Sequence, residues 1–350
     1  MEQTDSAGDP GEYLRRIAYL LERQHANTYR VRAFRQAAEA VGQTGPERLA
    51  ALHLSGRLAD LPGIGPTTAQ IVGEALEGRV PGYLQELESQ PVAPLSPEAL
   101  RYRARLSGDC HSHSDWSDGG SSIREMAEAA AALGHSYLVL TDHSPRLTVA
   151  HGLDAARLSE QLDVVAALNE ELAPFRILTG IEVDILEDGS LDQDLGLLAD
   201  LDVVVASVHS KLGMEARFMT QRMLRAIESP HTDILGHCTG RKLVGRGRKP
   251  SAFDAEAVFA ACAATGTAVE INSRPERRDP PAELISAAID AGCLFSIDTD
   301  AHAPGQLEWL GFGCEQAAEV AVPPDRVVNG WTLDEVLAWA GDRAVPSPPG

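Results

Sequence analysis

The sequence predicts an α/β fold in which a (β/α)7 TIM-like barrel follows a small all-α domain. Three observations support this prediction. In about the first 90 residues, apolar residues recur at helical spacing. A proline-rich stretch over residues 90–97 then interrupts this pattern. From Leu106 onward, short β-branched or apolar runs alternate with Ala- and Leu-rich stretches, which is typical of βα units around a parallel sheet.

The chain divides into three predicted parts: a helical domain over residues 1–90, a linker over residues 91–105 and the barrel domain over residues 106–342. In the helical domain, apolar spacing predicts helices over residues 11–24, 29–41 and 67–76, with an interruption over residues 61–66. The prolines between residues 90 and 97 disfavour both helix and strand, so this stretch is expected to be the linker.

The barrel domain contains seven candidate strands. They are the run entering Asp109 and residues 137–141, 176–182, 203–208, 233–235, 268–271 and 295–298. Helices are expected between them, including residues 123–133, 153–172 and 253–264. Seven βα repeats imply a barrel more readily than an open sheet, although the pattern alone does not establish closure.

Composition limits the classes of function. The 350 residues carry a net charge of −21, so the overall field does not hold the chain to DNA or a membrane, and a polyanion must be captured by local cations. Neither a signal peptide nor a membrane span is recognised, so a cytoplasmic location is expected, without a membrane or protein partner. The five cysteines form no C-x-x-C pair and are expected to be reduced core residues.

Residues able to bind metal or phosphate follow nearly every predicted strand. In a parallel βα barrel these positions are the carboxyl ends of the strands, so residues distant in sequence meet at one rim. In chain order they are His111, His113, Asp118, His143, Glu182, His209, His237, Asp300 and His302. At the sixth strand, the polar residues at the carboxyl end are Glu270 and Asn272. Alternation along an extended segment should point the imidazoles of His111 and His113 to one side.

Imidazole nitrogens and carboxylate oxygens together suit Zn, Mn or Fe, and carboxylates can bridge two ions. The alternative is that each histidine is an isolated surface or core residue. Six of the 11 histidines follow predicted strands with acids beside them, which favours a metal site. His25, His53, His135 and His231 are expected to be isolated surface or core residues, and no role is assigned to His151.

At these residues the sequence resembles the PHP (polymerase and histidinol phosphatase) superfamily. The matching motifs lie at residues 109–119, 140–144, 180–184, 206–209, 235–237 and 298–302, and they span nearly all of the second domain. The resemblance implies a distorted (β/α)7 barrel that holds up to three divalent metal ions, Mn, Zn or Fe, at its carboxyl rim.

The resemblance also implies a distribution of ligands. In this distribution His111, His113, Glu182 and Asp300 hold one ion, Glu182 bridges to a second ion bound by His209 and His237, and Asp118, His143 and His302 hold a third. Because all nine positions carry competent ligands, catalysis is expected, with metal ions lowering the pKa of bound water to about 7. Catalytic roles are expected for Glu182, Asp300, His143 and Arg146.

The sequence is most similar to the PHP domain that ends bacterial family X DNA polymerases. Residues 144–153 resemble the loop of that subgroup, which more often has Asn where His151 stands, and residues 27–34 and 61–76 resemble its helical DNA-binding domain. Those polymerases carry a nucleotidyl-transfer domain between the two parts, where this chain has only the proline-rich linker. Polymerase activity is therefore not expected.

Gly63-Ile64-Gly65 between two helical stretches matches a helix-hairpin-helix, whose glycines and helix amides approach a DNA phosphate. A simple tight turn is the alternative. Backbone contacts to DNA are predicted for Gly63, Gly65 and Thr67, and for a basic cluster of Arg30, Arg32 and Arg35 that could instead be a solvated helix face. The first 100 residues contain no lysine, which excludes a Schiff-base lyase there.

Basic residues in the loops after His237 and Asn272 are expected to bind phosphate, with Arg241, Arg246 and Arg274 as the candidates. The resemblance implies a Mn-dependent 3′–5′ exonuclease or 3′-phosphoesterase in DNA repair. Two alternatives stay open: a small-molecule phosphatase of the histidinol-phosphatase type, and a noncatalytic DNA-binding adaptor.

Overall fold

The computed structural model describes residues 8–341, which fall into two compact units that divide between Pro94 and Leu95. Residues 1–7 of the predicted helical domain and residue 342 of the predicted barrel domain lie outside the described part. No helix within residues 8–341 is both long enough and apolar enough to cross a membrane.

The first unit is entirely helical. Its helices are α1 (Pro10–Arg23), α2 (Thr28–Thr44), α3 (Pro46–Leu54), α4 (Pro66–Leu76) and α5 (Gly82–Glu88), with a 3-10 turn η1 (Leu58–Asp60). The three predicted helices are confirmed as α1, α2 and α4, whereas α3 and α5 were not expected. Leu14, Ile17 and Leu21 recur on one face of α1 and are buried in the core of this unit.

The hairpin between α3 and α4 depends on one glycine in particular. Gly63 has a φ of 84°, which residues with a Cβ rarely adopt, and a Cβ there would also lie 3.4 Å from the carbonyl oxygen of Gln36. Gly65 has an extended backbone, and its N–H donates to Oγ1 of Thr68 at 2.9 Å. This bond caps the start of α4 and fixes how the loop enters the helix.

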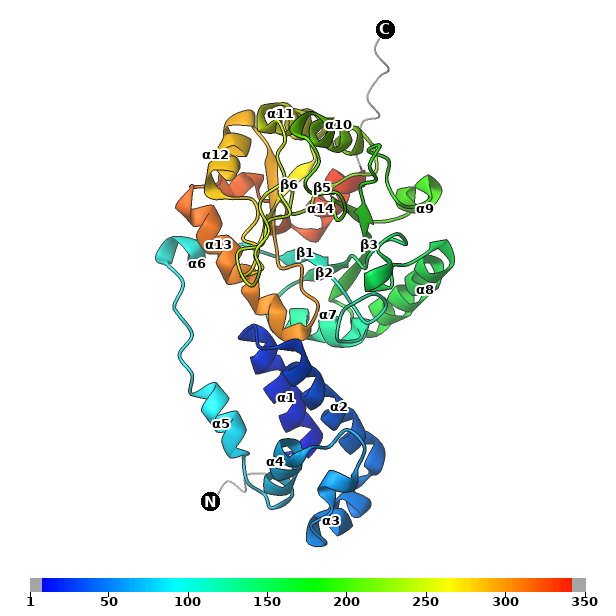
Figure 1. Ribbon diagram of the computed structural model, residues 1–350, viewed down its shortest axis with the longest axis vertical. Helices are drawn as coiled ribbons and strands as arrows, with labels where there is room; N and C mark the ends of the chain where they lie inside the picture. Colours follow the sequence, from blue (N-terminus) through cyan, green and yellow to red (C-terminus); the bar gives the residue numbers. More distant parts are fainter. Residues whose placement is uncertain (1–7, 342–350) are drawn as a thin grey trace. The chain divides into compact units, whose positions relative to one another are not determined.

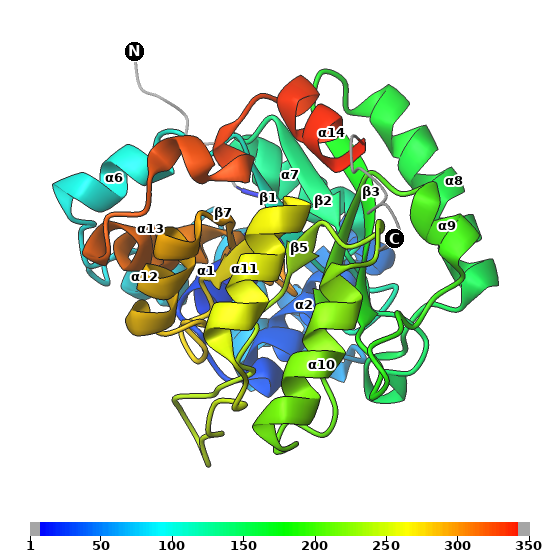
Figure 2. The same cartoon turned by 90° about the horizontal axis from the view of Figure 1, so that it is seen from above.

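Seven parallel strands form the centre of the second unit, in the order in which they occur along the chain (Figures 1 and 2). They are β1 (Gly108–Ser112), β2 (Tyr137–Leu140), β3 (Arg176–Asp184), β4 (Val203–Ser207), β5 (Ile234–Leu235), β6 (Ala268–Asn272) and β7 (Leu294–Asp298). All seven predicted strands are therefore confirmed, most with ends shifted by one or two residues.

Helices and short 3-10 turns surround the strands. The helices are α6 (Pro97–Arg103), α7 (Ile123–Ala132), α8 (Ala155–Glu171), α9 (Leu195–Ala199), α10 (Ala216–Ile227), α11 (Ala255–Thr265), α12 (Ala282–Ala291), α13 (Leu310–Glu319) and α14 (Leu333–Gly341). The 3-10 turns are η2 (Thr148–Ala150), η3 (Pro304–Trp309), η4 (Pro324–Arg326) and η5 (Val328–Gly330). The expected helices at 123–133, 153–172 and 253–264 correspond to α7, α8 and α11.

Alternate residues of a strand enter different parts of the core. In β4, Val203 and Val205 join a cluster that includes Val336 of α14, whereas Val204 and Ala206 pack with residues of the surrounding helices. Every residue of β4 is buried, as expected for a parallel strand that is covered on both faces.

The barrel is nearly closed between β1 and β7, where a buried side chain bridges the two strands. Ser112 and Ala301 form an isolated parallel bridge at the carboxyl end of this seam. Further down, Nδ2 of Asn329 donates to the carbonyl oxygens of Gly108 at 3.2 Å and Ile297 at 2.6 Å, and its Oδ1 accepts from N–H of Ile297 at 3.1 Å. The amide of Asn329 thus replaces part of a β-ladder.

The predicted linker over residues 91–105 is shorter than expected, because Pro97 begins α6. A proline is tolerated in the first turn of a helix, where its missing N–H has no helical partner. Oγ of Ser96 accepts from N–H of Ala99 at 3.1 Å, and Ser96 also donates to Glu315 of α13 from its N–H at 2.6 Å and its Oγ at 2.8 Å. Residues 97–103 therefore belong to the barrel unit.

Candidate metal centre

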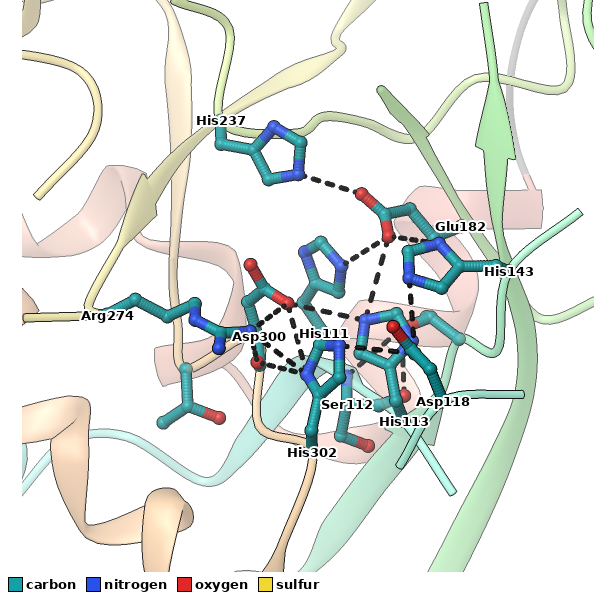
Figure 3. A network of polar contacts seen from close by, with 12 residues as sticks. His111, Ser112, His113, Asp118, His143, Glu182, His237, Arg274, Asp300 and His302 are labelled. Atoms are coloured by element: carbon teal, nitrogen blue, oxygen red, sulfur yellow. Dashed lines mark hydrogen bonds and ion pairs between the residues drawn. The ribbon is translucent and has the colours of Figure 1, made fainter. Parts of the chain in front are cut away.

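The carboxyl ends of the strands bring the nine predicted ligands into one largely buried cluster, in which only Asp118 is exposed. Figure 3 labels all of them except His209. β1 and the turn after it supply His111, His113 and Asp118; His143 follows β2, Glu182 lies in β3, His209 follows β4, His237 follows β5, and Asp300 and His302 follow β7. The ring centroids of His111 and His113 lie 5.2 Å apart, so the two imidazoles are neighbours as predicted.

Glu182 is the centre of this cluster, with only 1% of its side chain exposed. Five imidazoles surround its carboxylate. Oε2 lies 2.9 Å from Nδ1 of His143, 3.4 Å from Nε2 of His111 and 3.6 Å from Nε2 of His113, and Oε1 lies 2.9 Å from Nε2 of His237 and 3.2 Å from Nε2 of His209. Each oxygen therefore faces a different set of imidazoles, which is the arrangement of a bridging carboxylate.

A second group of donors surrounds Asp118 and Asp300. Oδ1 of Asp118 lies 3.3 Å from Nε2 of His302 and 3.4 Å from Nε2 of His143. Oδ1 of Asp300 lies 3.4 Å from Nε2 of His113, which also faces Glu182. The two groups are therefore continuous through His113 and His143.

The donor atoms fit divalent cations. Both carboxylate oxygens of Glu182 and the Nε2 atoms of His111, His113 and His237 are buried without a hydrogen-bond partner among the described residues. Three sets of donors lie close enough to share an ion: His113, Asp118, His143 and His302; His111, His113 and Glu182; and His143, Glu182 and His209. Because unpaired buried nitrogens and carboxylate oxygens are costly, cations are the partners that best satisfy this donor set.

A buried acid that was not predicted as a site residue orients two of the imidazole-bearing residues. Oε1 of Glu270 lies 2.6 Å from Nδ1 of His111, and its Oε2 accepts the backbone N–H of His237. The bond at Nδ1 leaves Nε2 of His111 to face Glu182. The position of Glu270 could have been predicted from the sequence. It lies two residues before Asn272 in β6, so the two side chains share one face of the strand.

Asp184 plays a corresponding part for His209. It is two residues after Glu182 in β3, its Oδ1 accepts N–H of His209 at 3.1 Å, and the same oxygen lies 3.5 Å from Nδ1 of that ring. Asp142, next to His143, instead accepts from N–H of Ser114 at 2.8 Å and therefore fixes the turn after β1. Carboxylates that bond to a ligand residue in this way hold that ligand in one orientation.

The electrostatics keep both central carboxylates ionised. Burial raises the pKa of Glu182, but the charges of His209, His111 and His143 more than reverse this, so its pKa lies well below the ordinary value. Burial likewise raises the pKa of Asp300, and the charges of Arg274 and His111 bring it well below the ordinary value. Negative charge is therefore present at the cluster near neutral pH.

The imidazoles respond to their surroundings in opposite ways. Burial lowers the pKa of His113 well below the ordinary value, helped by the charges of His302 and His143, and burial with the charge of Arg277 lowers that of His237. For His209, burial lowers the pKa but Glu182 and Asp184 raise it more, to about 9. The neutral rings are already in the form that binds metal, whereas binding at His209 displaces a proton.

The predicted phosphate-binding arginines occupy three different places. Arg274 lies at the cluster, where Nη1 is 3.3 Å from Oδ1 of Asp300 and 3.0 Å from Nδ1 of His302. Arg241 donates from Nε to the carbonyl oxygen of Arg277 at 3.0 Å and so braces the next loop, and Arg246 is exposed. Arg146, predicted as catalytic, has a side chain that is 70% exposed, with Nε 3.6 Å from Oδ1 of Asp192.

The predicted DNA-binding residues lie in the helical unit. Gly63, Gly65 and Thr67 are exposed at the hairpin, and Arg30 and Arg32 are exposed on α2. Arg35 does not join this surface, because its guanidinium pairs with Glu22 through Nε at 2.9 Å and Nη2 at 3.0 Å. Glu22 lies 13 residues before Arg35, in α1, and the packing of α1 against α2 brings the two side chains together.

Two family models match this chain. Residues 109–274 match the PHP domain, and residues 9–80 match a helix-hairpin-helix domain. The two matched segments fall in the two structural units, and the PHP segment contains seven of the nine cluster residues, all except Asp300 and His302.

Several curated relatives are similar to the chain. The "DNA polymerase/3'-5' exonuclease PolX" of Bacillus subtilis is 41% identical over 235 residues, which cover 67% of this chain but only 41% of that protein. A "Probable phosphatase" of Syntrophotalea carbinolica is 28% identical over 243 residues, covering 67% of this chain and 95% of that protein. A crystal structure of histidinol phosphate phosphatase from Lactococcus lactis, complexed with Zn, L-histidinol and phosphate, matches 62% of this chain and 93% of that one with a TM-score of 0.45 and 17% identity.

Proposed function

Because this chain belongs to the PHP superfamily of metal-dependent phosphoesterases and carries a helix-hairpin-helix domain, we propose that it hydrolyses phosphate esters at the 3′ ends of DNA strands. The reaction is 3′–5′ exonucleolytic or removes a 3′ phosphate, and it belongs to DNA repair. The observation that carries the proposal is Glu182, a buried carboxylate whose two oxygens face five imidazoles.

The cluster supplies what phosphate-ester hydrolysis requires. Divalent ions held there, with Mn proposed as the physiological metal, would activate water and neutralise the phosphoryl oxygens. Glu182 and Asp300 provide the negative charge that holds such ions, and Glu270 and Asp184 keep the imidazoles of His111 and His209 in place. We propose that Arg274, whose Nη1 lies 3.3 Å from Oδ1 of Asp300, holds an oxygen of the same phosphate.

The helical unit supports DNA as the substrate. A helix-hairpin-helix binds the phosphate backbone without reading bases, and the exposed Gly63, Gly65 and Thr67 are the proposed contacts. Arg30 and Arg32 remain proposed contacts, whereas Arg35 is engaged by Glu22. The similarity to the Bacillus subtilis exonuclease points the same way, although this chain spans only 41% of that protein's length. The five buried thiols suit a reducing compartment, and the cytoplasm is the proposed location.

A second candidate is a small-molecule phosphatase. It is favoured by the Syntrophotalea carbinolica relative, which is named as a probable phosphatase and of which this chain covers 95%. A helix-hairpin-helix domain has no evident use in such an enzyme, so we place this function second.

A direct assay separates these functions. The full chain is incubated with Mn²⁺, Zn²⁺ or Fe²⁺ and with 5′-labelled strands that end in a 3′ hydroxyl or a 3′ phosphate, and in parallel with histidinol phosphate. Shortening or dephosphorylation of the strands is expected. Turnover of histidinol phosphate alone would establish the second candidate, and binding of strands without cleavage by any metal-loaded form would make the chain an adaptor.

A further inference from the structure

A hairpin on the carboxyl side of β5 carries side chains that the cluster does not use. Residues 240–249, here called the 240–249 hairpin, turn back on themselves through mutual N–H to O bonds of 2.9 Å between Lys242 and Arg248. Gly245 and Gly247 have φ values of 68° and 64° and form its tip, where Gly247 donates to the carbonyl oxygen of Val244 at 3.1 Å. Figure 2 shows the segment between β5 and α11 extending outward past the end of α11.

The hairpin concentrates positive charge in a strongly acidic protein. It contains Arg241, Lys242, Arg246, Arg248 and Lys249, and residues 238–253 include no acid. Burial, followed by the charges of Arg277, Arg248 and Arg274, lowers the pKa of Lys242. The cations of the hairpin and of the loop after β6 therefore lie close enough to repel one another, and a bound polyanion would relieve that repulsion.

Two large apolar side chains stand among these cations. Leu243 is 53% exposed and Val244 is 54% exposed, so neither fills the core of the unit. Adjacent exposed apolar residues inside a cluster of cations suit a ligand that presents apolar faces next to negative charges. The bases and phosphates of a nucleic-acid strand have that chemistry.

The hairpin is joined to the metal centre through the loop after β6. Leu243 donates its N–H to the carbonyl oxygen of Glu276 at 2.7 Å, and Arg241 donates from Nε to the carbonyl oxygen of Arg277 at 3.0 Å. Nε of Arg277 in turn lies 3.4 Å from Oδ2 of Asp300. A strand held by the hairpin is therefore held next to the ligands of the cluster.

We propose that the 240–249 hairpin separates the end of the strand to be cleaved from its complement. Lys242, Arg246 and Lys249 bind phosphates, while Leu243 and Val244 pack against a base near the scissile bond and unstack it from the duplex. This inference rests on the proposed function and names the form of its substrate, an unpaired strand end. The continuity of the hairpin with Asp300 favours a strand over a partner protein as its ligand.

The test compares Leu243→Ser/Val244→Ser with the unsubstituted chain, each loaded with Mn²⁺. Three substrates are used: a blunt duplex, the same duplex with three mismatched bases at the 3′ end, and bis(p-nitrophenyl) phosphate. Leu100→Ser on α6 is the matched control, because Leu100 is also 53% exposed but lies outside the loops of the carboxyl rim. Because all three side chains face solvent, every variant is expected to fold.

For the double variant, kcat/KM on the blunt duplex is expected to fall about tenfold, with a loss of less than about threefold on the mismatched duplex. Hydrolysis of the small ester should not change in either variant. Equal losses on both duplexes, or no loss on either, would overturn the role of the hairpin. If the unsubstituted chain hydrolyses the small ester but neither shortens the duplexes nor removes a 3′ phosphate from the strands of the direct assay, the proposed function itself has failed. This outcome is read from the unsubstituted chain alone.

Discussion

Oε1 of Glu182 lies 2.9 Å from Nε2 of His237, and neither atom makes a hydrogen bond with any described residue, although both side chains are only 1% exposed. Two buried polar atoms that approach each other without hydrogen-bond geometry indicate a common partner between or beside them. Nε2 of His111 and of His113 repeat the relationship on Oε2 of the same carboxylate. Several cations sharing Glu182 account for all of these contacts at once.

Replacing Glu182 with Gln tests this bridging role. The amide keeps the shape of the side chain but removes its charge and one of its two acceptor oxygens, so we expect at least about a 100-fold loss of phosphoesterase activity and a reduced content of bound metal. Metal is measured by elemental analysis of the purified protein. Glu256→Gln, on the exposed side of α11, is the control and should retain both. Full metal content and activity in the Glu182 variant would disprove the bridge.

Glu270→Gln should have a different signature. Glu270 contacts Nδ1 of His111 and the backbone N–H of His237 rather than the Nε2 atoms that face Glu182, so we expect metal affinity to weaken by about 10–100-fold. Raising the Mn²⁺ concentration should restore most of the rate in this variant but not in Glu182→Gln. A rate that stays low at saturating metal would place Glu270 among the reacting groups instead.

Chelation should destabilise the barrel unit. A metal ion that binds only the folded state adds about 2.7 kcal/mol to its stability when the free ion is at 100 times its dissociation constant. Dialysis against EDTA is therefore expected to lower the melting temperature, and Mn²⁺, Zn²⁺ or Fe²⁺ should restore it in proportion to affinity. Differential scanning calorimetry measures the change. A melting temperature that is indifferent to EDTA and to all three ions would contradict the metal centre.

Asn329→Ala should weaken the seam between β1 and β7. The substitution leaves the carbonyl oxygens of Gly108 and Ile297 and N–H of Ile297 without their partner in a fully buried site. Each unpaired buried group costs about 1–3 kcal/mol, so a loss of about 3 kcal/mol or more in the free energy of unfolding is expected in urea titrations.

Asn169→Ala is the matched control for the seam. Asn169 bonds to both N–H and carbonyl oxygen of Ile177, at 2.7 and 2.9 Å, but it is only partly buried. Water can replace these bonds, so the loss should be clearly smaller. If both variants lost the same free energy of unfolding, Asn329 would contribute no more to stability at the seam than Asn169 does elsewhere.

His135 should make the fold sensitive to mild acid. Burial, together with the charge of Arg103, lowers the pKa of this 5% exposed imidazole to about 4 from the ordinary 6.5. The unfolded chain therefore takes up this proton first, so the contribution of His135 is fully present above pH 6.5 and is lost as the pH falls toward 4. Between pH 7 and pH 5 the loss amounts to about 2 kcal/mol.

Urea unfolding at pH 7 and pH 5 measures this effect. His135→Gln, which does not titrate, should lose about 2 kcal/mol less than the unsubstituted chain over that interval. The comparison cancels the contributions of other groups, because they are present in both proteins. Parallel curves for the two proteins would mean that the proton on His135 does not control the acid sensitivity.

Local patterns in the sequence were enough to predict much of this protein. Short apolar runs located all seven strands, and the helical period located α1, α2, α4, α7, α8 and α11. The ligand positions were also predictable, since the carboxyl end of a parallel strand always lies at the same rim and residues such as His143 and His209 come directly after their strands.

What the sequence alone determined, therefore, is the succession of strands and helices and the set of donors at the rim, because both follow from spacing along the chain. The tertiary structure decided which donors lie together, since the two oxygens of Glu182 are divided among imidazoles from four strands. It also decided that Arg35 pairs with Glu22, that Glu270 orients His111 and that Asn329 fills the seam. These contacts join residues distant along the chain, and only packing fixes their distances and directions.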